Sequence, residues 1–113
     1  MARTGISTTV FHILVALAGQ DRHGYSIMQD VAARTDGRIK LSPGTLYGAI
    51  RRLLEEGLIQ ELDERPDPEN DDERRRYYRL TTAGYAAARE EAAQLNRMLG
   101  QARANGLVPG DTP

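Results

Sequence analysis

The residues best suited to contacting another molecule lie in the segment LSPGTLYGAIRRLLEEGLI, at positions 41–59. If this segment forms a helix from Pro43, its polar arc contains two glycines four residues apart, Gly44 and Gly48. Each glycine costs about 1 kcal/mol relative to alanine in a helix interior. One physical use for such glycines is a flat strip on which a partner can approach the backbone. A tyrosine and two arginines flank the strip, which favours a nucleic-acid groove as the partner.

The opposite arc of the same helix is apolar. Its members recur at spacings of three and four residues, as on the buried face of an amphipathic helix. They are Leu46, Ala49, Ile50, Leu53 and Leu54. Ser42 followed by Pro43 is a strong start signal, because serine caps a helix and proline suits the first turn. Gly57 suits the left-handed position just past a helix end, so the sequence predicts a helix that begins at Pro43 and stops at Gly57.

Three further helices are expected from the same spacing of apolar residues. They cover Thr8–Ala18, Tyr25–Arg34 and a long final segment that follows a cap at Thr81 or Thr82 and ends at about Arg103. The segment GQDRHG, at 19–24, is expected to be a turn.

Two short strands are expected after the helix at 43–56. Leu58–Leu62 and Arg75–Leu80 alternate apolar and polar residues, which is typical of strands. The segment between them, ERPDPENDDE at 64–73, contains two prolines and an acidic run, and it is expected to be a loop. Strand, loop and strand together predict a β-hairpin.

Three helices followed by a hairpin is the order of elements in a winged helix-turn-helix domain. In that fold the third helix enters the major groove and the hairpin, or wing, flanks it. The predicted fold class is therefore mainly α with a small β-hairpin. We expect a winged helix-turn-helix DNA-binding domain at 1–80, a C-terminal dimerisation helix at 81–104 and a disordered tail at 105–113.

Length and composition limit the classes of protein that fit. A chain of 113 residues forms one domain with a modest core. Cysteine is absent from the sequence, so neither disulfides nor thiolate metal sites are expected. The two histidines have no ligand partners at metal spacing, and there is neither a phosphate-binding glycine loop nor a paired histidine and carboxylate. We therefore expect no enzyme, metal or cofactor, and we expect a cytoplasmic protein with no membrane partner.

The formal net charge of −1 conceals a strongly polarised distribution. The segment Arg38–Arg52 carries four basic residues and no acid, a balance of +4. The segment Glu61–Glu73 carries eight acids and one arginine, a balance of −7. Four arginines then follow within Arg74–Arg79. Both basic blocks fall where a recognition helix and a wing are expected, which favours a nucleic-acid partner.

Three segments resemble the PadR family of bacterial transcriptional regulators. They are HGYSIMQDV at 23–31, SPGTLYGAIRRLLEEGLI at 42–59 and RRRYYRLTTAG at 74–84. The resemblance covers Phe11 to Gly84 closely. It implies a homodimer joined through the C-terminal helix, and a repressor that binds an inverted-repeat operator, in some members released by a small-molecule effector. The long acidic segment at 61–73 departs from the short basic wings of the family, which puts phosphate contact by the wing tip in doubt.

Ten residues are the candidates for contact with double-stranded DNA. They are Lys40, Ser42, Gly44, Thr45, Tyr47, Gly48, Arg51, Arg74, Arg75 and Arg76. The start of a recognition helix reaches base edges and holds phosphates, and Arg51 would suit a guanine edge. Structural alternatives remain open: Ser42 is also a helix cap, Tyr47 could pack inward, and the wing arginines could pair with the acids at Glu69–Glu73.

The final helix has a second candidate surface. Tyr85, Ala88, Ala92, Leu95, Leu99 and Ala102 follow alternating steps of three and four residues. This a/d pattern predicts a dimerisation seam. Its first turns could instead dock onto their own domain.

A winged helix can also serve as a protein-interaction module without reading DNA. The acidic segment at 61–73 favours that alternative, because it would repel a duplex. The two-glycine face with its arginines favours DNA.

Overall fold

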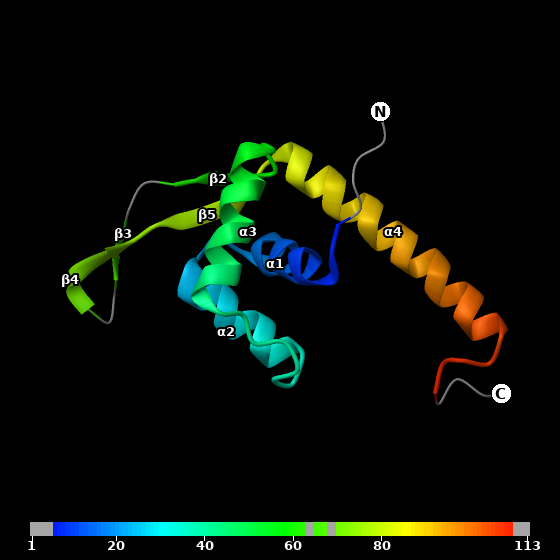
Figure 1. Cartoon of the computed structure of the whole chain (residues 1–113). Coiled ribbons are helices and arrows are strands. Elements are labelled where there is room, and N and C mark those ends of the chain that lie inside the picture. Colours follow the sequence, from blue (N-terminus) through cyan, green and yellow to red (C-terminus); the bar gives the residue numbers. More distant parts are fainter. Residues whose placement is uncertain (1–5, 63–64, 68–69, 110–113) are drawn as a thin grey trace.

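The structure, a computed structural model, describes residues 6–62, 65–67 and 70–109 (Figure 1). Its helices are α1 (Thr8–Gly19), α2 (Gly24–Arg34), α3 (Pro43–Glu55) and α4 (Thr82–Ala104). Its strands are β1 (Arg22–His23), β2 (Ile59–Glu61), β3 (Arg65–Asp67), β4 (Asn70–Arg75) and β5 (Tyr77–Leu80). The predicted winged helix fold, mainly α with a small antiparallel sheet, is confirmed.

The sheet at the base of the wing has three antiparallel strands in the order β1-β5-β2. In β5, Tyr78 lies opposite Arg22 of β1 and Glu61 of β2. Strand β1 falls within the segment 19–24, for which we predicted only a turn. A strand of two residues shows no alternation in sequence, and it exists here because β5 supplies its hydrogen-bonding partner.

The wing, which we define as residues 59–80, contains two more strands than the predicted hairpin. The prediction of a plain loop at 64–73 is wrong, because β3 and β4 pair as a second antiparallel ribbon with Arg65 opposite Arg75. Arg75 accordingly belongs to β4 and β5 starts at Tyr77. Pro66 suggested a loop, but the ribbon has only two strands, and proline is tolerated on a strand that lacks a second neighbour.

Both ends of α3 have the capping residues that the sequence predicted. The Ser42 side chain accepts a hydrogen bond of 3.1 Å from the Thr45 N–H. At the other end Gly57 has φ +74°, and its N–H donates to the Leu54 carbonyl at 3.1 Å. The Leu58 N–H donates to the Leu53 carbonyl at 3.0 Å, which completes a Schellman cap and directs the chain into β2.

The core lies between α1, α2, α3, the sheet and the first turns of α4. Its largest fully buried side chains are Ile13, Leu14, Leu17, Ile27, Val31, Leu46 and Leu53. From the predicted apolar arc of α3, Leu46, Ile50 and Leu53 are buried, while Ala49 and Leu54 are partly buried. The amphipathic pattern therefore places α3 with one face on the core and the other in solvent.

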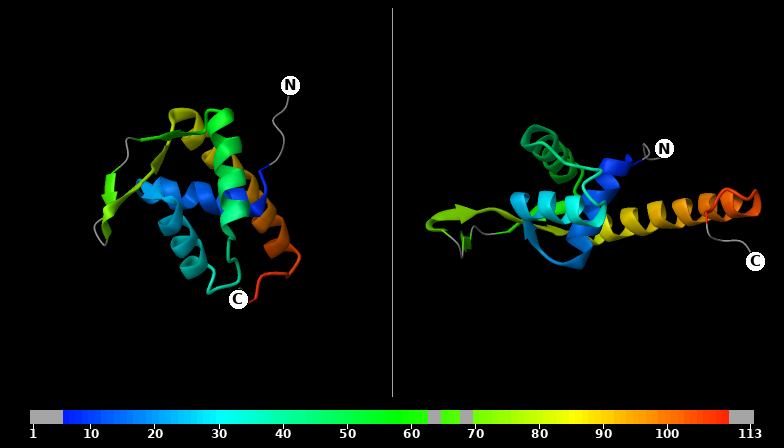
Figure 2. Two further views of the ribbon diagram at one scale, coloured as in Figure 1. Left: turned by 60° about the vertical axis from the view of Figure 1, so that its left-hand side comes forward. Right: turned by 90° about the horizontal axis from the view of Figure 1, so that it is seen from below.

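Helix α4 leaves the body after its first turns (Figure 2). Gly84 and Ala87 are buried, whereas every residue from Ala92 to Ala104 except Ala102 is exposed. The Leu107 N–H donates to the Ala102 carbonyl at 2.9 Å, so the tail predicted at 105–113 begins with a capping turn. Residues 110–113 lie outside the described part of the chain. Among the described residues, no helix has the length and apolar character needed to cross a membrane.

Candidate nucleic-acid interface

The outward face of α3 gathers the predicted contact residues in one place. Every member of the predicted set from this helix is exposed: Ser42, Gly44, Thr45, Tyr47, Gly48 and Arg51. The Ser42 hydroxyl both caps the helix and lies 3.0 Å from the Thr45 hydroxyl, to which it hydrogen-bonds. The cap interpretation of Ser42 is therefore correct, and the cap holds the Thr45 hydroxyl at the protein surface.

The two glycines of this face border open space. A Cβ added to Gly44 or Gly48 would meet no atom within 4 Å. Packing inside the protein therefore does not require glycine at either position. The pair leaves a strip of bare helix backbone that a partner can approach closely.

Tyr47 borders this strip and is 46% exposed. Its ring lies across the start of α2, where a Cβ on Gly24 would collide with the tyrosine hydroxyl. The alternative of inward packing is therefore partly correct for Tyr47. Its hydroxyl end rests against α2, while its ring borders the open strip. The bare Cα of Gly24 makes room for this contact.

Four basic side chains on or just before α3 pair with no acid among the described residues. Arg38, Lys40, Arg51 and Arg52 are exposed, and none forms an ion pair within the described residues. Several arginines elsewhere in the fold pair with carboxylates, as Arg79 does with Asp21 at 2.8 Å. The hydrogen bond from Arg79 to Asp21, together with their opposite charges, raises the pKa of Arg79. The α3 face therefore presents positive charge that is available to an external anion.

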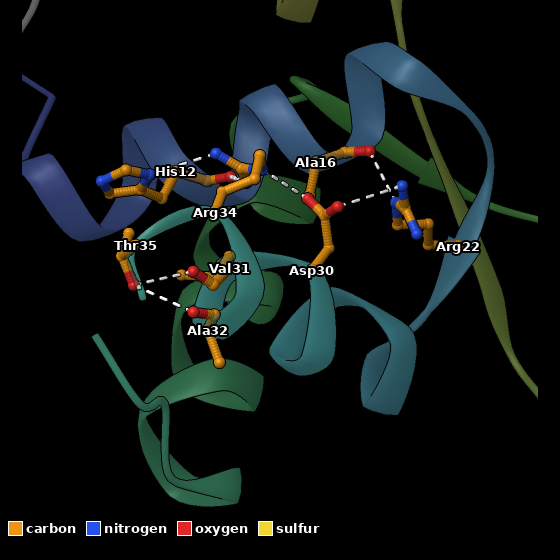
Figure 3. A network of polar contacts seen from close by, with 8 residues as sticks. All are labelled: His12, Ala16, Arg22, Asp30, Val31, Ala32, Arg34 and Thr35. Carbon is orange, nitrogen blue, oxygen red and sulfur yellow. Dashed lines mark hydrogen bonds and ion pairs between the residues drawn. The ribbon is translucent and has the colours of Figure 1, made fainter. Parts of the chain in front are cut away.

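A polar network fixes α2, which supports α3, against α1 (Figure 3). Asp30 pairs with Arg34 at 2.7 Å and with Arg22 at 3.3 Å. Arg34 also donates to the His12 carbonyl, and Arg22 donates to the Ala16 carbonyl, both at 2.9 Å. These bonds join side chains of α2 and β1 to the backbone of α1, a structural role for these residues.

The wing arginines come from a later part of the chain than the α3 face. Arg76 is 63% exposed in its side chain, and its Nη1 lies 3.8 Å from Oε1 of Glu61. Arg74 and Arg75 lie in β4. Arg76 therefore pairs with an acid, as the alternative interpretation expected. The acid is Glu61 of β2, however, and not one of the acids expected from the loop.

Comparison with known proteins places this geometry in a family. The sequence model described as "Transcriptional regulator PadR-like family" matches residues 13–90. This chain belongs to the PadR-like family of transcriptional regulators. No curated protein matches the chain.

Solved structures agree with the family assignment. A transcriptional regulator from Clostridium thermocellum has a TM-score of 0.69 and 27% identity, over 88% of this chain and 91% of that one. A PadR family transcription regulator from Clostridium difficile has a TM-score of 0.68 and 25% identity, over 90% of this chain and 100% of that one. A Streptococcus transcriptional regulator has a TM-score of 0.72, with 20% identity over 87% of this chain and 91% of that one.

The segments that carry the PadR resemblance contact one another in the structure. Gly24 of HGYSIMQDV lies under Tyr47 of GTLY. Gly84 of TTAG lies against Leu58 of GLI, so closely that a Cβ there would collide with the Leu58 carbonyl. These glycines occur where helices and strands from distant parts of the sequence meet.

The exposed part of α4 carries an apolar row on this PadR-like chain. From the predicted seam, Leu95 is 40% exposed and Leu99 is 44% exposed. Earlier in the helix the Tyr85 hydroxyl donates to the Ala18 carbonyl at 3.4 Å, and Ala88 packs on the core. The first turns of α4 therefore dock on their own domain, which was the alternative to a dimerisation role for this part of the helix.

Two exposed apolar residues of this region were missing from the predicted seam. Met98 is 53% exposed and Leu107 is 71% exposed. Met98 could have been included from the sequence, because it precedes the seam residue Ala102 by four residues, a helical spacing. Leu107 lies beyond the helix and is placed beside it by the capping turn, which the helical spacing could not indicate.

The open glycine strip leads to a prediction in which stability and binding move in opposite directions. Gly48→Ala should raise the free energy of unfolding by about 0.5–1 kcal/mol, because alanine is the better helix former and its methyl group meets no atom. The same methyl group should weaken binding to duplex DNA. Thermal unfolding and fluorescence anisotropy measure the two effects.

Gly100→Ala is the matched control for Gly48→Ala. Gly100 is also helical and has no atom within 4 Å of an added Cβ, but it lies in α4, away from α3. It should give a similar gain in stability with DNA affinity unchanged. Tight DNA binding by Gly48→Ala would show that nothing approaches the strip.

Proposed function

We propose that this PadR-like chain is a sequence-specific DNA-binding transcriptional regulator with α3 as its recognition helix. The observation that carries the proposal is the α3 face: a bare backbone strip beside basic side chains that pair with no described acid. A convex helix face of this kind fits the major groove, where the helix start addresses base edges and phosphates. We propose no catalytic role and no cofactor.

We further propose that the regulator is a homodimer joined through α4. The exposed apolar row supports this, because Leu95, Met98 and Leu99 would otherwise remain in water. Two recognition helices related by a twofold axis would address an inverted-repeat operator, with half-sites spaced by about 34 Å or a multiple of it. Binding near a promoter would make the protein a cytoplasmic repressor, and a small-molecule effector would release it.

Arg51→Ala should weaken binding to the operator far more than binding to random duplex. Arg51 is exposed on the outward face of α3, and a bidentate contact to guanine contributes about 1–3 kcal/mol of discrimination. The expected loss on the operator is therefore about 5- to 150-fold. The operator would first be selected from a random duplex pool, and both affinities would be measured by anisotropy.

Arg97→Ala, on α4, is the control for the removed positive charge. Arg97 hydrogen-bonds Gln94 within its own helix, far from α3. If Arg51→Ala lowers the affinity for operator and for random duplex equally, Arg51 contacts phosphate and does not read a base. Failure of the unmodified protein to enrich any sequence from the pool would refute the proposed function as a whole.

The runner-up function is a protein-interaction module. The observation in its favour is that the acidic segment 61–73 includes a paired ribbon, β3 and β4, rather than a loop. The segment 61–73, with its balance of −7, would suit a basic protein surface. Neutralising its acids separates the two functions: tighter duplex binding supports the DNA regulator, and loss of a protein partner supports the module.

A further inference from the structure

A buried tyrosine at the base of the wing has a hydroxyl with no hydrogen-bonding partner among the residues that the structure describes. Tyr78 of β5 is 4% exposed, and its ring belongs to the core. Within the described chain its hydroxyl makes no hydrogen bond. No fully buried polar side-chain atom among these residues is unpartnered, so the Tyr78 hydroxyl must reach solvent. Phenylalanine would fill the same core space, and only tyrosine adds a donor at the surface.

The surroundings of this hydroxyl come from three elements. Glu61 of β2 lies directly opposite Tyr78 in the sheet, and Nη1 of Arg76, between β4 and β5, lies 3.8 Å from Oε1 of Glu61. The charges of Glu61 and Arg76, and the hydroxyl of Tyr47 in α3, act electrostatically on the Tyr78 hydroxyl. The Tyr47 hydroxyl rests against Gly24, the first residue of α2. Two phenol hydroxyls and a guanidinium thus gather where the recognition helix meets the wing, beside the positive end of the α2 dipole.

These groups have the chemistry of a phosphate site. Phenol O–H and guanidinium N–H groups donate to phosphate oxygens, and the dipole of α2 favours a negative charge at its first residue. Burial, and then the negative charge of Glu61, raises the pKa of Tyr78. The hydroxyl therefore stays protonated, and remains a donor, throughout the neutral pH range.

We propose that Tyr78, Tyr47 and Arg76 form a binding site for one phosphate of the DNA backbone at the junction of α3 and the wing. The inference rests on the proposed function. It adds Tyr78, which was not among the ten candidates from the sequence, to Tyr47 and Arg76, which were. The site positions the duplex and carries no base preference, since phosphate contacts are the same for every sequence.

The Glu61 carboxylate competes with a phosphate for Arg76 and repels the phosphate charge. This carboxylate lies 3.8 Å from Arg76 and faces the same groups. The pair is loose and its side chains are 63% and 38% exposed, so Arg76 can turn to an incoming phosphate. Removing the Glu61 charge should therefore strengthen DNA binding, the opposite of removing a hydroxyl.

Tyr78→Phe tests the site directly. It should lower affinity for the selected operator and for random duplex by the same factor, about tenfold, because a hydrogen bond to a charged group is lost. The slope of log affinity against log salt should not change, since no cation is removed. Thermal stability should be retained, because the hydroxyl has no hydrogen-bonding partner in the described part of the fold. Tyr77→Phe, on the adjacent residue of the same strand, should bind DNA as the unmodified protein does.

Three further measurements complete the test. Glu61→Gln should bind duplex more tightly than Glu90→Gln, which removes the same charge from α4. Tyr47→Phe should repeat the loss seen with Tyr78→Phe. If inorganic phosphate shifts the melting temperature in a Tyr78-dependent way while duplex affinity is insensitive to Tyr78→Phe, the site binds a free anion and the proposal is overturned.

The outcomes separate this inference from the proposed function. If the unmodified protein selects an operator and Tyr78→Phe binds it equally well, the phosphate site is wrong and the regulator stands. If Tyr78→Phe loses stability along with affinity, the hydroxyl has a structural role and the proposal also fails. If no duplex binds the unmodified protein, both fail together.

Discussion

Leu95→Glu combined with Leu99→Glu is expected to give a monomer that no longer binds its operator tightly. Both leucines lie on the part of α4 that extends beyond the body, and they are 40% and 44% exposed (Figure 1). In the proposed dimer each glutamate would place a negative charge against apolar partner residues at the seam. Burial of unpaired charge is strongly unfavourable, so the dimer should dissociate.

The fold of each protomer should survive this double substitution. The exposed position of both side chains means that the core of α1, α2 and α3 is not altered. Sedimentation velocity would show the change of mass, and circular dichroism would show an intact helical protein. Operator affinity should fall by about 10²–10⁴-fold, because two linked recognition helices gain that much from the second binding event.

A charge-matched control is available on the other side of the same helix. Gln94→Glu with Gln101→Glu adds the same two charges at exposed positions outside the seam. This variant should sediment as a dimer and keep its operator affinity. A dimer that persists in the leucine variant would place the subunit contact elsewhere on the molecule.

The elements with local signals could be predicted from the sequence. Helix α3 has its apolar arc, its Ser42 cap and its Gly57 terminator all within one short segment. Each of these signals depends on neighbours three or four residues away, so no tertiary information is needed. The same reasoning placed the exposed face of α3, which is the centre of the candidate interface.

Features that depend on distant partners could not be predicted. Strand β1 forms only because β5 runs beside it, some 55 residues later (Arg22 opposite Tyr78, His23 opposite Tyr77). The contact of Tyr47 with Gly24 joins two helices, and either residue alone looks like an ordinary part of its helix. The ribbon of β3 and β4 was missed because its prolines and acids are poor strand formers in isolation.

The surroundings of the Tyr78 hydroxyl also depend on distant parts of the chain, so the sequence could not predict this part of the site. Neighbouring side chains of a strand point to opposite faces, so at most one of Tyr77 and Tyr78 can join the core, and Tyr78 does. Alternation gives the direction of a side chain but not what its far end meets. The approach of Tyr47, Glu61 and Arg76 to that end results from the packing of α3 against the sheet.

Gly84→Ala is expected to lower the free energy of unfolding, unlike the other two glycine-to-alanine substitutions, Gly48→Ala and Gly100→Ala. Gly84 lies in the first turn of α4, and its added Cβ would collide with the Leu58 carbonyl oxygen. That carbonyl also accepts the Thr81 N–H at 3.1 Å, and Thr81 in turn caps α4 by accepting the Gly84 N–H at 3.0 Å. The colliding atom is backbone held at both sides, so relief requires α4 to move away from β2.

Such a shift would open the core where α4 joins the body, and overpacking of this kind costs about 3 kcal/mol. For a domain of this size the melting temperature should fall by about 10 °C or more. Gly100→Ala, later in the same helix, has free space for its methyl group and should raise the melting temperature instead. Thermal unfolding followed by circular dichroism compares the two variants. Equal melting temperatures for Gly84→Ala and the unmodified protein would mean that α4 is free to move on the body, and the fixed placement of the dimer seam relative to α3 would then be lost.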